Sequence, residues 1–148
     1  MHRLEREQVV PVPPAEAFEF FADAYNLEAI TPAWLHFRVA SPAPIAMGTG
    51  TLIRYRLRLH GVPVRWLTRI ETWEPGRSFR DVQVRGPYRV WRHTHTFTPH
   101  EAGTTIRDRV DYALPLGPLG RLAHGVLVRR DLERIFDFRA AAVAAGLS

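Results

Sequence analysis

Two histidines stand two residues apart in the stretch Trp91-Arg92-His93-Thr94-His95-Thr96-Phe97. On an extended strand, alternate side chains point to the same face, so both histidines share a face with the flanking aromatic residues. Two imidazoles on one face can hold a metal ion, transfer protons, or form part of a hydrogen-bonded wall. Which of these applies depends on the groups that lie opposite.

The partners of the histidines depend on the register between residues 79–85 and 89–98, which we interpret as a hairpin. A three-residue loop at 86–88 brings Asp81 and Gln83 onto the face of the histidines, whereas a two-residue loop turns them away. We favour the three-residue loop, although the sequence alone leaves the register open. It pairs Arg85 with Arg89, Gln83 with Trp91, Asp81 with His93 and Phe79 with His95.

A further carboxyl group, Asp108, alternates onto the same face of the last strand as Tyr112. A metal site would need more than a His-x-His pair, and no third histidine has a place, so we expect no metal and no cofactor. Acid/base catalysis would use His93 or His95 beside Asp81. Alternatively, the histidines are buried and hydrogen-bonded, and the same network orients the polar end of a ligand.

Aromatic residues on neighbouring strands extend this face. Tyr55 and Trp66 fall on inward positions and, like Tyr112, offer apolar area with one polar contact each, as ligand pockets require. The candidate ligand-binding residues are Tyr55, Trp66, Asp81, Gln83, Trp91, His93, His95, Asp108 and Tyr112. From the final helix we expect core residues at Leu119, Leu122, Val126 and Phe136.

The pattern of the chain predicts the elements that position these residues. Period-two alternation indicates strands and 3.6-residue spacing indicates helices. In order we expect a strand over 6–13, helices over 14–23 and 25–32, strands over 34–40, 51–60, 64–73, 79–85, 89–98 and 104–114, and a helix over 118–145 that Gly125 could bend. In the strand over 64–73, the inward face is Val64, Trp66, Thr68, Ile70 and Thr72. Short turns imply antiparallel pairing, and the long helix must cover the apolar face of the sheet.

Composition limits the function classes. The chain has 148 residues, which suits one domain over 1–148, and it has no cysteine, so thiolate chemistry is excluded. We find neither a signal peptide nor a stretch of about 20 apolar residues, so we expect a cytoplasmic protein without integral membrane contact.

The net charge is +5, and all twenty basic residues are arginine. A coding bias that replaces lysine explains this better than a specific anion partner. Outward arginines could still dock on anionic lipid or nucleic acid, namely residues 54, 56, 58, 65, 69, 107 and 109. Because Glu71 and Asp111 interrupt them and no exposed aromatic residue accompanies them, we expect no nucleic-acid partner.

The order of one strand, two helices, six strands and a long helix resembles the START-like superfamily, also called SRPBCC or polyketide cyclase/dehydrase and lipid transport. The local cues are VPVPPAEAFEFFAD (10–23), W-x-H-x-H-x-F and GTTIRDRVDYALPLGPLG (103–120). Small stand-alone bacterial ligand-binding SRPBCC proteins are the most similar branch. The resemblance implies an α+β helix-grip (START/Bet v 1-like) fold, in which a curved antiparallel sheet of about seven strands wraps round the C-terminal helix, with two short helices after the first strand.

The resemblance also implies an apolar cavity between the sheet and the long helix, but no catalytic residue. We therefore expect binding, transport or sequestration of a small amphipathic or aromatic, lipid-like molecule, and we lean against an enzyme, although the sequence leaves open whether any reaction is catalysed. One alternative is a cyclase/dehydratase-type enzyme with a cavity histidine as general acid or base. The other is an interaction domain with a filled core. The sequence leaves the ligand, the pathway and the oligomeric state open.

Overall fold

A computed structural model describes the backbone of residues 1–148 and every side chain except that of Val126. The strands are β1 (His2–Val10), β2 (Arg38–Val39), β3 (Leu52–Leu59), β4 (Val62–Glu74), β5 (Ser78–Arg85), β6 (Val90–His100) and β7 (Gly103–Ala113). The helices are α1 (Pro14–Ala22), α2 (Asn26–Ala29), the short 3₁₀-helix η1 (Ala33–Leu35), α3 (Gly117–Ala123), the π-helix η2 (His124–Val128) and α4 (Arg129–Gly146).

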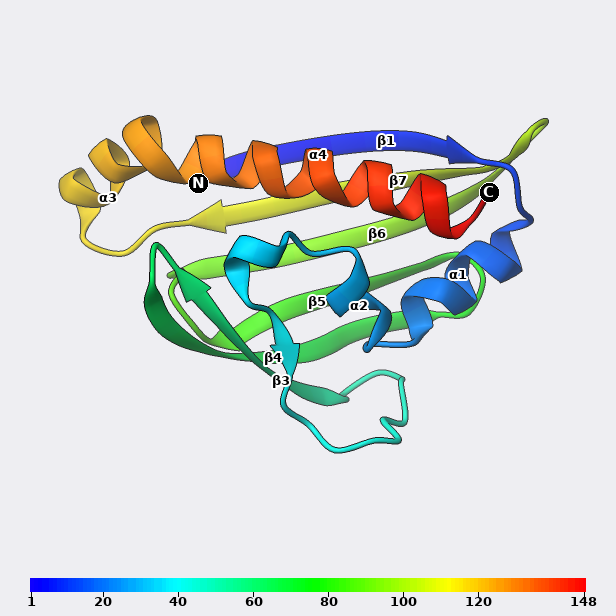
Figure 1. Cartoon of the computed structure of the whole chain (residues 1–148), viewed down its shortest axis with the longest axis horizontal. Helices are drawn as coiled ribbons and strands as arrows, with labels where there is room; N and C mark the ends of the chain where they lie inside the picture. Colours follow the sequence, from blue (N-terminus) through cyan, green and yellow to red (C-terminus); the bar gives the residue numbers. More distant parts are fainter.

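The seven strands form one antiparallel sheet in the order β1-β7-β6-β5-β4-β3-β2. The sheet curves, and α4 runs lengthwise along it, while α1 and α2 lie toward the C-terminal end of α4 (Figure 1). This arrangement confirms the predicted helix-grip fold. Among the described residues, no helix is both long enough and apolar enough to span a bilayer.

Period-two alternation explains why the sheet has a buried and a solvent face. Ile53 of β3, Ile70 of β4 and Ile106 of β7 point inward and are almost completely buried. The arginines that alternate with them, such as Arg54 and Arg107, are exposed. Burying one face against helices is what an amphipathic sheet requires for stability.

The first two predicted strands had wrong bounds. β1 begins at His2 instead of residue 6, because its alternating residues pair along β7, and it ends at Val10, before the prolines that cannot donate to a ladder. The strand predicted over 34–40 is reduced to Arg38–Val39. Its first part forms η1, which ends where His36 adopts a left-handed backbone conformation, with φ of 48°.

A β-bulge in β4 corrects the predicted inward face of that strand. The register between β4 and β5 shifts between Ile70 and Thr72, so one extra residue of β4 has no partner. A bulge reverses the alternation beyond it. Thr72, which we predicted to point inward, is exposed, and Trp73 packs against the core in its place.

The C-terminal helical segment agrees with the prediction in extent but not in all its contacts. It covers Gly117–Gly146, and Gly125 lies inside the π-helical turn. Leu119 and Leu122, which we predicted to be core residues, are exposed, because α3 projects beyond the end of the sheet (Figure 1). Phe136 is buried as predicted, and the side chain of Val126 lies outside the described part.

Candidate functional site

The β5–β6 ladder has the register predicted from a three-residue loop. Asp81 is opposite His93, and Phe79 is opposite His95. The ladder ends earlier than predicted, at the pair of Val82 and Arg92. On the other side of β6, β7 places Asp108 directly opposite His95. Two carboxylates therefore flank the two imidazoles from neighbouring strands.

The histidines and carboxylates form a compact buried cluster. Nε2 of His93 donates to Oδ1 of Asp108 at 2.8 Å, and Nε2 of His95 donates to Oδ2 of Asp81 at 2.9 Å. Nδ1 of His95 lies 3.2 Å from Oδ1 of Asp108 but is not aligned for a hydrogen bond, and it has no partner among the described residues. Each carboxylate thus accepts a hydrogen bond from one imidazole and orients its ring.

Aromatic rings hold the two imidazoles in place. The rings of His93 and His95 stack with centroids 3.7 Å apart, and Phe79 stacks on the other face of His95 at 4.0 Å. Phe136 of α4 meets the ring of His93 edge-on, with centroids 5.6 Å apart. This packing surrounds the imidazoles with apolar rings, and the low local dielectric strengthens the electrostatic interactions inside the cluster.

The surroundings push the pKa values of the two histidines apart. Burial lowers the pKa of both imidazoles, because it disfavours the charged form. For His95, the interactions with Asp108 and Asp81 outweigh burial and raise its pKa above the ordinary value. For His93, burial and the neighbouring charge of His95 prevail over the Asp108 hydrogen bond and lower its pKa. The geometry therefore favours a charged His95 beside a neutral His93.

Both carboxylates stay ionised. Burial alone would raise the pKa of Asp81 and of Asp108, but the hydrogen bonds from the histidines and their positive charge outweigh burial. The pKa of Asp81 is lowered, and that of Asp108, which contacts both imidazoles, is held far below its ordinary value. A positive charge on Arg139 adds to the effect on Asp81.

A cavity of about 140 Å³ lies beside this cluster. Its walls come from β3, β4, β5, β6, α4 and the segment from α2 to Phe37. Six of the nine predicted site residues line it, namely Tyr55, Trp66, Asp81, Trp91, His93 and His95. The rings of Trp66 and Trp91 meet edge to face at 5.2 Å, and Trp91 lies next to His93 with ring centroids 6.3 Å apart, so aromatic and charged side chains adjoin in the cavity wall.

The other three predicted residues do not line the cavity. The side-chain amide of Gln83 donates to the carbonyl of Tyr88 at 2.7 Å and accepts from its N–H at 3.1 Å, so Gln83 closes its own hairpin. Asp108 is hydrogen-bonded to His93 and does not itself line the cavity. The hydroxyl of Tyr112 is 2.7 Å from Nε2 of His124, in the π-helical turn η2.

Arg139 is the functional candidate that sequence reasoning missed. It lines the cavity from α4, and its Nε is buried without a hydrogen-bond partner among the described residues. Its position follows from helical spacing, because it lies three residues after the buried Phe136 and four before the buried Val143. We missed it because a charged residue on a helix is normally assigned to the solvent side.

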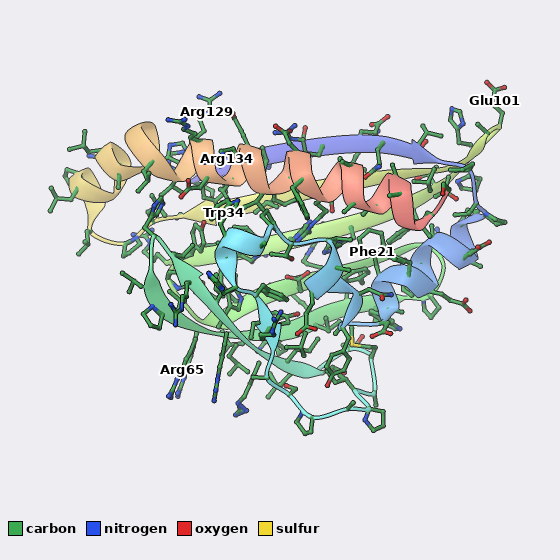
Figure 2. All side chains as sticks on the ribbon, viewed as in Figure 1. Phe21, Trp34, Arg65, Glu101, Arg129 and Arg134 are labelled. Carbon is green, nitrogen blue, oxygen red and sulfur yellow. The ribbon has the colours of Figure 1, made fainter. Side chains whose placement is uncertain are left out.

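Two contacts tie α4 to segments next to the cavity lining. Nε2 of His60, in the β3–β4 turn, is 2.6 Å from Oδ2 of Asp131. The guanidinium of Arg134 lies 5.3 Å from the centroid of the Trp34 ring, and Figure 2 shows these two side chains between α4 and η1. The helix is therefore tied both to the β3–β4 turn and to η1.

The residues that could hold a metal ion are Asp81, His93 and His95. One ligand atom from each lies within 4.8 Å of the others. In the structure, Nε2 of each imidazole already donates to a carboxylate. A metal ion would therefore compete with a hydrogen-bonded network that satisfies most of the polar atoms.

Comparisons with known proteins agree with this fold. The model of the family described as polyketide cyclase / dehydrase and lipid transport matches residues 1–147. A comparison with curated protein sequences gives no match.

Solved structures resemble the chain over nearly its whole length. Protein CV1439 from Chromobacterium violaceum is 15% identical with a TM-score of 0.78, and the match covers 99% of this chain and 98% of that one. Ara h 8.0201 is 17% identical with a TM-score of 0.70, covering 99% and 97%. Major latex-like protein 151 from Panax ginseng is 11% identical with a TM-score of 0.69, covering 99% and 97%. At these identities the likeness establishes the fold.

Proposed function

Because this chain belongs to the polyketide cyclase / dehydrase and lipid transport family, we propose that its cavity binds a small aromatic or amphipathic molecule. The observation that carries the proposal is a cavity with aromatic walls that converge on a buried charged cluster. The apolar walls would supply affinity at roughly 25 cal/mol per Å² removed from water. The cluster would fix the orientation of the polar end.

The size of the cavity favours a ligand of about one ring. Apolar cavities on the order of 150 Å³ hold a benzene-sized molecule, whereas pockets for drug-sized ligands measure about 300–1,000 Å³. At about 140 Å³, this cavity has the size that holds a benzene-sized molecule. A long-chain lipid would require α4 or the segment around η1 to move outward.

Arg139 supports a hydrogen-bond acceptor on the ligand. A buried N–H without a partner is costly, by about 1–3 kcal/mol, so its presence in a cavity wall calls for an explanation. An oxygen atom of a bound ligand would accept a hydrogen bond from the guanidinium of Arg139, which carries five N–H donors. Asp81 and Arg139 together offer the ligand one acceptor and one donor across the same cavity.

Native mass spectrometry of the freshly purified protein, compared with its denatured mass, tests this function. Extra mass in the native state identifies a bound molecule, and fragmentation gives its class. Phenol and benzoate then serve as single-ring probes, and we expect His93→Ala to weaken their binding. His100→Ala is the control, because His100 is exposed at the end of β6. Absence of any bound molecule together with no probe binding would contradict the proposal.

One observation favours an enzyme as the second candidate. His93 is held neutral beside an ionised Asp108 that orients its ring, as a general base requires. A cyclase or dehydratase would convert its substrate to a product of altered structure or mass. It would also show a pH–rate profile governed by an imidazole and removed by His93→Ala. A ligand released unchanged would favour binding alone.

The cavity also argues against the third reading, an interaction domain with a filled core. A filled core leaves few voids larger than a water molecule. The space beside His93 and His95 exceeds that by roughly tenfold, since one water needs about 10–15 Å³ on a comparable scale.

A further inference from the structure

The outer face of the sheet, opposite α4, has two halves that differ in charge. Residues 29–70 contain six arginines and no acidic residue. These arginines, with one more from β5, occupy outward positions on β2, β3, β4 and β5. We call this surface the arginine face: Arg38, Arg54, Arg56, Arg58, Arg65, Arg69 and Arg85. Figure 2 shows Arg65 projecting from the sheet on the side away from α4.

The strand register places arginines of this face directly opposite one another. Arg56 of β3 pairs with Arg38 of β2 on one side and with Arg65 of β4 on the other. Neighbouring strands are only about 4.8 Å apart, and like charges directly opposite each other destabilise a sheet. No member of the arginine face has an acidic partner within 4.0 Å among the described residues.

The other half of the same outer face is neutralised. On β1 and β7, Arg3 contacts Asp111 at 2.8 Å, Arg107 contacts Glu7 at 2.7 Å, and Arg109 contacts Asp111 at 3.4 Å. A coding bias explains why the basic residues are arginine. It does not explain why ion pairs with acidic residues neutralise the arginines of one half, whereas the arginine face has no such partner among the described residues. Glu71 of β4 is paired with Arg80 of β5, which is not part of that face.

We propose that the arginine face docks on an anionic lipid bilayer. Guanidinium groups bind phosphate through paired hydrogen bonds, and clustered arginines are drawn to anionic headgroups. Four of these arginines line a groove of about 320 Å³, namely Arg54, Arg56, Arg65 and Arg85. The inference goes beyond ligand binding and does not depend on the cavity.

The composition of the face favours a bilayer over nucleic acid. Leu52 and Val84 are exposed beside the arginines, and Leu67 is half-buried between Arg65 and Arg69. A surface that mixes apolar and basic side chains suits the headgroup region of a bilayer. The outward positions of these strands carry no aromatic residue on which single-stranded bases could stack.

The test is co-sedimentation of the whole chain with vesicles of phosphatidylcholine, with and without phosphatidylglycerol, at low and high salt. We expect binding only to the anionic vesicles and its loss at high salt. In Arg56→Gln/Arg65→Gln, the partition coefficient should fall roughly 25-fold, at about fivefold per arginine. The matched control Arg107→Gln/Arg109→Gln removes the same charge from the neutralised half. Its partition coefficient on anionic vesicles should fall far less.

Equal losses in the two double variants would overturn the proposal, because they would reflect net charge alone. So would equal binding to neutral vesicles, or tighter binding to duplex DNA than to the anionic vesicles. Thermal unfolding followed by circular dichroism supplies a second readout. Removing the opposed charges should leave the melting temperature of Arg56→Gln/Arg65→Gln unchanged or higher, and a large decrease would contradict the cost assigned to those pairs. If Arg56→Gln/Arg65→Gln is destabilised, the vesicle measurement is made on Arg54→Gln/Arg69→Gln instead. This variant keeps the opposed pair of Arg56 and Arg65.

Discussion

The ring of Phe79 stacks on the imidazole of His95, with centroids 4.0 Å apart and planes 13° from parallel. The two residues are also direct partners in the β5–β6 ladder. An aromatic face attracts a cation, so Phe79 acts in the same direction as the two carboxylates that contact His95. The site therefore combines three stabilising influences on one charged imidazole while the adjacent His93 has a single carboxylate partner.

The first prediction concerns the order in which the two histidines titrate. In protein freed of metal by chelator treatment, His95 should remain protonated above pH 6.5, because Asp108 and Asp81 raise its pKa. His93 should remain neutral below pH 6.5, because burial and the charge of His95 lower its pKa. Imidazole nitrogen shifts in an NMR titration give both values. The reverse order would contradict the hydrogen-bond network described here.

The pKa shifts also predict how stability depends on pH. The contribution of His95 is complete below its ordinary pKa of 6.5 and is lost as pH rises through the raised value. The contributions of Asp81 and Asp108 are present above about pH 3.8 and are lost as pH falls through their lowered values. Because the pKa of His93 is lowered in the folded protein, its burial adds a further loss of stability as pH falls below 6.5.

Urea unfolding at a series of pH values measures this dependence. The free energy of unfolding should decrease on both the acidic and the alkaline side of the neutral range. His95→Gln should remove the decrease on the alkaline side that comes from the cluster. An alkaline slope that persists unchanged in His95→Gln would assign it to another group.

Loss of the Asp108 charge should be costly. Asp108→Asn keeps the shape of the side chain but leaves a buried imidazolium with one carboxylate fewer, and breaking buried ion pairs costs about 3–5 kcal/mol. We expect a loss toward the lower end, about 3 kcal/mol, since Asp81 remains. Asp137→Asn is the control, because its ion pair with Arg6 is exposed and such pairs contribute less than about 1 kcal/mol. Similar losses in the two variants would argue against the cluster as a stabilising unit.

The fold could be predicted because its signals are local. Alternation over β3, β6 and β7 and helical spacing over α4 each lie within one element. The register of β5 against β6 is the one that we favoured, although the sequence alone left it open. Where the prediction was wrong, the local structure depends on strand pairing or on the backbone conformation of one residue. Examples are the bulge that exposes Thr72 and the left-handed His36 that ends η1.

The candidate site was only partly predictable for a related reason. Residues on one strand face could be grouped, which brought His93, His95 and Asp81 together correctly. Alternation does not tell whether an inward residue reaches the cavity or satisfies a local backbone group, as Gln83 does with Tyr88. Nor does it say which turn of a helix lies over the cavity, so Arg139 was missed.

Filling the cavity should abolish ligand binding without removing any polar group. Ile135 lines the cavity from α4, so Ile135→Trp would place an indole ring in the space proposed for the ligand. We expect loss of benzoate and phenol binding, with a change in stability of at most about 1–3 kcal/mol from overpacking. Binding is measured by calorimetry, and Leu119→Trp on the exposed face of α3 is the control. Unchanged binding in a folded Ile135→Trp would place the ligand elsewhere.

Two glycines should respond in opposite directions to the same substitution. Gly103 begins β7 with φ of 141°, and a Cβ there would lie 2.1 Å from the carbonyl oxygen of Val10. Gly103→Ala must therefore strain the backbone or separate β7 from the end of β1, at a cost of about 1–3 kcal/mol. Gly125 lies in the π-helical turn, and a Cβ there would meet no atom within 4 Å. Gly125→Ala should raise the free energy of unfolding by at most about 1 kcal/mol, because alanine has a higher helix propensity than glycine. Urea unfolding of both variants at neutral pH distinguishes these effects, and a destabilised Gly125→Ala would mean that the π-helical turn depends on glycine.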